Sequence, residues 1–190
     1  MKVVATFFVV LLLAGCASVT KVESGQRAIG ERLTVTLQGA WNYIDAPGLG
    51  PAQVWTMEGM PVDQLLLYSG LKDGQAVHAT GGGAQAKTFA FRGSMQPDEI
   101  VALFEGMLTR DGSRFALTKL SPVPFAGKTG FRFDYTLIRK IDNVQLTGIG
   151  WGMVDKGELY AIIYTAPRIV FFERHRPGVE QIAMSARLKN

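Results

Sequence analysis

Cysteine, histidine and clustered charge are scarce in this sequence, and each scarcity excludes a class of protein. Cys16 is the single cysteine among 190 residues, so no disulfide can form within the chain and stability must come from an apolar core. The two histidines, His78 and His175, have no histidine, cysteine or carboxylate partner at metal-ligand spacing, so we expect no metal site. The 20 lysines and arginines are spread along the chain rather than clustered, which argues against a nucleic-acid partner.

Enzyme motifs are present only as near-matches. Residues 81–88 approach the phosphate-loop pattern G-x-x-x-x-G-K-[ST], but Ala86 replaces a required glycine and the loop leads into a strand-like segment rather than a helix. Residues 69–72 and 128–130 resemble the S-x-x-K and K-T-G elements of penicillin-recognising enzymes, yet no S-D-N element lies between them. We therefore expect no catalytic residue and no cofactor.

The one long hydrophobic run lies at the N-terminus. Residues 3–14 follow Lys2 and fall well short of the roughly 20 residues that a membrane-spanning helix needs, so residues 1–15 are expected to be a signal peptide. Leu13-Ala14-Gly15-Cys16 resembles the lipobox of bacterial lipoproteins, which implies acyl chains on Cys16 that anchor the protein to a membrane. In such lipoproteins Ala17 in place of aspartate implies the outer membrane, with the protein facing the periplasm.

The segment after the cysteine is expected to be a linker. Residues 16–31 are polar with little periodicity, which predicts a lipidated tether and leaves residues 32–190 as a single domain. Leu33, Val35 and Leu37 alternate with polar residues, the period of a half-buried strand. Short apolar runs predict further strands at residues 41–44, 54–57, 65–68 and 89–92.

The strongest helical signal covers residues 97–108. Pro97 suits a first helical turn, and Asp98 and Glu99 lie where the helix dipole is positive. Apolar residues recur at helical spacing and form one stripe: Ile100, Val101, Leu103, Phe104, Met107 and Leu108. We expect this stripe to cover a sheet.

The second half of the chain predicts an antiparallel meander. Apolar runs separated by turn residues predict four strands at 115–120, 131–138, 144–154 and 159–165, with the first turn at Pro122 and Pro124. A terminal helix at 177–185 and a short edge strand at 187–188 complete the prediction. The fold class is therefore α+β, with a central antiparallel sheet flanked by helices.

A glycine stripe is the most unusual local pattern. Gly148, Gly150 and Gly152 alternate with larger residues, Trp151 among them, on one predicted strand. Because glycine weakens a strand, three in a row indicate that something approaches that face closely. A packed helix is one interpretation; the other is a groove for a lipid or peptide, which makes these four residues candidate ligand-binding residues.

The order of elements from residue 104 onward resembles the PsbP-like fold. A helix and a strand lead through Gly127-Lys128-Thr129-Gly130 into the strand at 131–135, then through residues 157–160 into the strand at 161–164 and a last helix. The resemblance implies an antiparallel sheet with helices on both sides. That fold family includes oxygen-evolving-complex subunits, a Ran-binding nuclear factor and bacterial lipoproteins, and implies a non-catalytic binding or assembly role.

Three functions follow as hypotheses. The first is a non-enzymatic envelope lipoprotein that binds a protein partner or assists assembly. The second is a carrier of lipid or another small hydrophobic ligand, which needs an apolar pocket of a few hundred Å³. The third is a hydrolase with a dispersed site, for instance using Asp134 or Glu158, which needs two carboxylates in one cleft.

Overall fold

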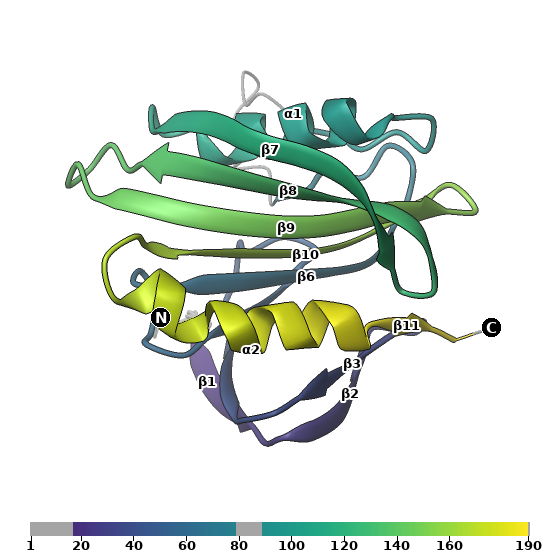
Figure 1. Ribbon diagram of the computed structural model, residues 1–190, viewed down its shortest axis with the longest axis horizontal. Helices are drawn as coiled ribbons and strands as arrows, with labels where there is room; N and C mark the ends of the chain where they lie inside the picture. The colour runs from purple at the N-terminus through teal and green to yellow at the C-terminus, as the bar shows by residue number, and fades with distance from the viewer. Residues whose placement is uncertain (1–16, 79–88, 190) are drawn as a thin grey trace, which may run out of the picture.

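An eight-stranded antiparallel sheet is the centre of the computed structural model, which describes residues 17–78 and 89–189 (Figure 1). Its strands lie in the order β1 (Ser18–Val22), β4 (Trp41–Asp45), β5 (Gln53–Thr56), β6 (Gln64–Leu71), β10 (Glu158–Pro167), β9 (Gln145–Asp155), β8 (Lys128–Ile138) and β7 (Arg114–Phe125). A second antiparallel sheet has the order β11 (Arg187–Leu188), β3 (Leu33–Leu37) and β2 (Gly25–Ile29). The helices are α1 (Pro97–Leu108) and α2 (Phe171–Ser185).

Strands β7 to β10 form the predicted meander, with one difference at its first turn. Strand β7 continues through Pro122 and Pro124 to Phe125, and the chain turns at Ala126 and Gly127 instead. Proline lacks the N–H that a central strand must donate, but β7 is the last strand of the sheet and, among the described residues, pairs with β8 alone. The prolines therefore lie at a free edge, where they do not interrupt a ladder.

Helix α1 has the predicted bounds. The Gln96 backbone N–H donates to Glu99 Oε2 at 2.8 Å, so the first turn is closed by a side chain from within the helix. Of the predicted stripe, Ile100, Val101, Leu103, Phe104 and Met107 are buried. This face packs on the sheet, as the stripe predicted.

The two faces of the large sheet carry separate cores. On one face, α1 packs over Phe133, Leu159, Ile163 and their neighbours. On the other face, α2 and strand β3 enclose Trp151, Ile162, Tyr164 and their neighbours. Figure 1 shows α2 below β6 in the view, running roughly along the strands of the large sheet, with β2 and β3 below it. Side chains that alternate along β10 therefore enter different cores, which explains why nearly the whole strand is buried.

Three parts of the predicted secondary structure are wrong. Residues 18–22 and 25–29 are strands β1 and β2, so the stretch predicted as a tether belongs to the folded domain, and Ile29 is in the core. Residues 89–92 contribute only an isolated bridge between Ala76 and Ala90. Helix α2 begins at Phe171, six residues before the predicted start, and Pro177 lies inside it.

Two sequence features fall outside the described residues: the lipobox with Cys16, and the glycine-rich segment at 81–88. The predicted edge strand at 187–188 is confirmed as β11, which pairs with β3. Within the described ranges, neither helix has the length and apolar character needed to cross a membrane.

Candidate ligand pocket

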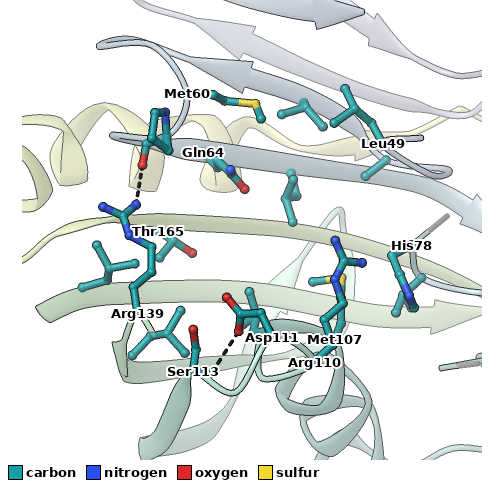
Figure 2. Close-up of a pocket in the computed structure, with 18 of the residues that line it drawn as sticks. Leu49, Met60, Gln64, His78, Met107, Arg110, Asp111, Ser113, Arg139 and Thr165 are labelled. Carbon is teal, nitrogen blue, oxygen red and sulfur yellow. Dashed lines mark hydrogen bonds between the residues drawn. The ribbon is translucent and has the colours of Figure 1, made fainter. Parts of the chain in front are cut away.

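A pocket of about 340 Å³ opens on the α1 side of the sheet, at the end that α1 leaves uncovered (Figure 2). Its floor is formed by side chains of four adjacent strands: Leu66 and Tyr68 on β6, Thr165 on β10, Leu146 on β9 and Leu137 on β8. The end of α1 and the segments at residues 48–52 and 60–62 form the walls. The pocket is thus built on rigid strands and closed by loops.

The polar groups of the floor already have protein partners. The Tyr68 hydroxyl donates to the Val77 carbonyl oxygen at 2.7 Å, and the Tyr135 hydroxyl lies 2.5 Å from Thr165 Oγ1. Burial raises the pKa of both tyrosines far above the ordinary value, so both hydroxyls remain protonated at any physiological pH. The floor therefore offers an apolar surface with satisfied hydroxyls rather than an ionisable catalytic group.

Charged side chains stand at the rim. Figure 2 shows Arg139 and Arg110 on either side of the pocket. Arg139 Nη1 donates to the Pro61 carbonyl oxygen at 2.7 Å, which ties the turn after β8 to the pocket wall. His78 lies on the same side as Arg110, and burial, together with the positive charge of Arg110, lowers its pKa. His78 is therefore neutral near pH 7.

Asp111 adds one carboxylate to this rim. Its Oδ1 accepts a hydrogen bond from the Ser113 backbone N–H at 2.9 Å. Burial opposes its ionisation, but the Ser113 hydrogen bonds and Arg110 together lower its pKa. An apolar floor with a mixed, mainly cationic rim is the arrangement that small-ligand sites show, and the volume lies in their range of roughly 300–1,000 Å³.

Comparison with known proteins identifies the fold. No family model matches this sequence, and no curated protein matches it either. The solution structure of cyanobacterial PsbP (CyanoP) from Synechocystis sp. PCC 6803 superposes with a TM-score of 0.58, covering 93% of this chain and 95% of that one at 12% identity. The fold is PsbP-like. At that identity the likeness concerns the fold alone, and it confirms the resemblance seen from residue 104 onward.

The glycine stripe of this PsbP-like domain does not line the pocket. Strand pairing places Phe131, Phe133 and Tyr135 of β8 directly opposite Gly152, Gly150 and Gly148. The rings lie over the glycines so closely that an added Cβ would be 2.6, 2.3 and 2.0 Å from them, respectively. We call these three rings the aromatic ladder. The close approach that the stripe indicated comes from the neighbouring strand, and α1 packs on the ladder through Phe104, whose ring stacks on Phe133 at 6.1 Å.

Trp151, the fourth candidate, lies on the other face of the PsbP-like sheet. It is 6% exposed and belongs to the core beneath α2. The Arg132 guanidinium stacks on its ring at 5.2 Å and also pairs with Asp134 and with Glu180 of α2. Neither the glycines nor Trp151 offers an open wall, so the groove expected at these four residues is filled by the protein itself.

The two carboxylates of the hydrolase hypothesis have different partners. Asp134 pairs with Arg132 at 2.9 Å, whereas Glu158 accepts from the Tyr160 hydroxyl at 2.7 Å. Glu158 belongs to an ionic cluster at the β9–β10 turn, where Arg32 pairs with Asp155 at 2.9 Å and Lys128 also contacts Asp155. This cluster joins the loop before β3 to the large sheet, which is a structural role.

Sequence reasoning missed the pocket because its residues come from distant segments. Of the residues around it, only His78 was weighed for a functional role from the sequence, and no metal site was expected there. The arginines at the rim looked like scattered surface charge. The aromatic ladder, in contrast, did have a local signal in the sequence. Aromatic residues occupy every second position of one predicted strand, and glycines occupy every second position of the next strand at the same distances from the turn between them.

Proposed function

We propose that the protein is a non-enzymatic lipoprotein of the bacterial cell envelope whose domain binds a small apolar or amphiphilic molecule. The observation that carries the proposal is the pocket on the α1 side, with an apolar floor on four strands and charged groups confined to its rim. Attachment through acyl chains on Cys16 to the outer membrane, facing the periplasm, is part of the proposal and rests on the lipobox pattern.

The geometry favours binding over chemistry at this site. The floor contributes leucines, Thr165 and one tyrosine, Tyr68, whose hydroxyl is held protonated, so it has no strong base or nucleophile to offer a substrate. The charged groups at the rim can orient a polar end while the body of the ligand lies on the leucines. An amphiphile with one apolar chain and an anionic or polar head matches this division.

The test is extraction of ligand from the purified lipoprotein, with a variant that fills the pocket. Leu66→Trp enlarges a floor residue, whereas Leu117→Trp makes the same change on strand β7 at a side chain that is 44% exposed and outside the pocket. We expect mass spectrometry of the extract to find one discrete small molecule with the native protein and with Leu117→Trp, and none with Leu66→Trp. Equal recovery from all three proteins, or none from the native one, would refute the ligand-binding role.

The anchor is tested separately. Cys16→Ser removes the thiol that the acyl chains need, so metabolic labelling with palmitate should be lost and the protein should leave the membrane fraction. Density separation of inner and outer membranes then gives the location of the native protein. Label retained in Cys16→Ser would contradict lipidation at this residue.

A protein-binding or assembly role is the second candidate, and strand β1 favours it. Among the described residues β1 pairs on one side only, with β4, and nearly all of its residues are exposed. It has no proline or bulge to block its free edge, so it can accept a strand from a partner. A stoichiometric protein that co-purifies with the native chain, and is lost in Thr20→Pro, would support this role.

A further inference from the structure

Five exposed hydrophobic side chains gather at one end of the molecule. Three connections meet there: the β5–β6 loop, the β8–β9 turn and the β10–α2 turn. Figure 1 shows the last two side by side at the left of the view. The side chains are Met57, Met60, Ile141, Ile169 and Val170, and the two isoleucines are 87% and 79% exposed. We call this set the apolar end.

Hydrogen bonds fix the three connections relative to one another. The Arg168 backbone N–H donates to the Gln145 carbonyl oxygen at 3.0 Å, which joins the β10–α2 turn to the start of β9. Arg139 Nη1 donates to Pro61, which joins the β8–β9 turn to the β5–β6 loop. Glu58 of that loop accepts from His175 Nε2 at 2.7 Å, which joins it to the first turns of α2. The apolar end is therefore one surface.

The backbone at Val170 is strained in a way that displays these side chains. Val170 has φ 74° and ψ −62°, a conformation that a β-branched residue rarely adopts. The Phe171 N–H donates to the Ile169 carbonyl oxygen at 3.0 Å and closes a tight γ-turn. Ile169 and Val170 both remain exposed, so burial of their side chains within the domain does not offset the strain.

The charges around the apolar end are mainly positive. Lys140 and Arg168 are adjacent in sequence to the two isoleucines, are exposed, and form no ion pair with another described residue. Three further cations are each paired with a carboxylate: Arg139 with Asp142, Arg174 with Glu58 and Arg176 with Glu173. With the buried Asp63 of the β5–β6 loop included, the end has one more positive than negative charge, and its two unpaired cations lie beside its most exposed apolar side chains.

We propose that the apolar end docks on the surface of an anionic lipid bilayer. Isoleucines on projecting turns, rather than in a groove, suit shallow insertion between lipid headgroups, and the two free cations lie where lipid phosphates would be. The proposal goes beyond the ligand-binding function and does not rest on it, although Met60 belongs to both the pocket wall and the apolar end. Docking would bring the pocket close to the lipid from which an amphiphile could enter.

The test uses vesicle co-sedimentation of the mature chain carrying Cys16→Ser, which removes the acyl anchor and keeps all the described residues. Vesicles contain either phosphatidylglycerol and phosphatidylethanolamine or phosphatidylcholine alone. We expect binding to the anionic vesicles, weakened by raising sodium chloride from about 0.05 M to about 0.5 M because salt screens surface charge. The double variant Ile141→Asn/Ile169→Asn should bind roughly tenfold or more weakly, because two large apolar side chains no longer enter the lipid.

Matched variants separate the outcomes. Met184→Asn removes an apolar side chain that is 69% exposed near the other end of α2, and it should leave binding unchanged. Lys140→Gln/Arg168→Gln should weaken binding and reduce its salt dependence. Absence of binding to anionic vesicles, or equal loss in Met184→Asn, would overturn the proposal. So would concentration-dependent dimers in sedimentation velocity that disappear in the isoleucine double variant, because a second copy would then occupy the surface.

Discussion

Replacing Gly150 with alanine should destabilise the protein, although alanine normally strengthens a strand. The new Cβ would lie 2.3 Å from two atoms of the Phe133 ring. The ring cannot move freely, because Phe104 stacks on it at 6.1 Å and Tyr135 at 5.8 Å. Overpacking of this kind costs about 1–3 kcal/mol, and removing the glycine's entropic penalty returns roughly 0.5–1 kcal/mol. With the middle of each range taken, the net loss is about 1–2 kcal/mol.

Thermal unfolding measures this loss. For a chain of this length about 1–2 kcal/mol corresponds to a Tm lower by roughly 2–8 °C. Gly178→Ala is the matched control, because a Cβ there meets nothing within 4 Å and the site lies in α2, so Tm should rise. Adding Phe133→Leu should remove most of the cost of Gly150→Ala, as a double-mutant cycle would show. A Gly150→Ala protein as stable as the native one would refute the idea that the aromatic ladder is rigid.

Three further predictions concern other parts of the domain. Burial lowers the pKa of His78 below 6.5, so the free energy of unfolding should fall as pH drops below about 6.5. His78→Gln should make the free energy of unfolding less dependent on pH in this range, and an unchanged pH dependence in the variant would contradict the prediction. Lys128 and Arg32 lower the pKa of Asp155, so its stabilisation is present above pH 3.8 and lost as pH falls through the lower native value. Asp155→Asn should therefore cost about 1 kcal/mol at pH 7 and little at pH 2, measured by urea unfolding. Phe104→Ala should cost about 3–5 kcal/mol in the same assay, since its ring is fully buried; a loss below about 1 kcal/mol would show that the α1 core re-packs.

The elements that could be predicted are those whose signals are local. Helix α1 carries its own first-turn residues and apolar stripe, and its bounds were predicted correctly. The meander was predicted because apolar runs alternate with turn residues along the chain, although only β8 buries every second residue. Strand β1 was missed because its side chains are exposed and it is held by backbone pairing with β4, which leaves no periodic pattern in the sequence.

The errors at proline have a common physical cause. Proline was taken to end strand β7 and to begin helix α2, because it cannot donate a backbone hydrogen bond. In β7 the missing donor would face outward from the sheet edge. In α2, Phe172 is 3% exposed and stacks on Tyr164 at 6.0 Å, so tertiary packing extends the helix in front of Pro177. Both outcomes depend on neighbours that are distant in sequence, as do the pocket and the apolar end.

Strand β1 has a consequence for the range of the protein. With acyl chains on Cys16, only Ala17 separates the anchor from a strand that begins at Ser18. Two residues of extended chain span at most about 7 Å, so the linker between the anchor and the domain would be too short for the domain to reach across a compartment. It would be confined to a thin layer at the membrane and would meet its targets by lateral diffusion. A ligand or partner of such a protein must itself be present in that layer.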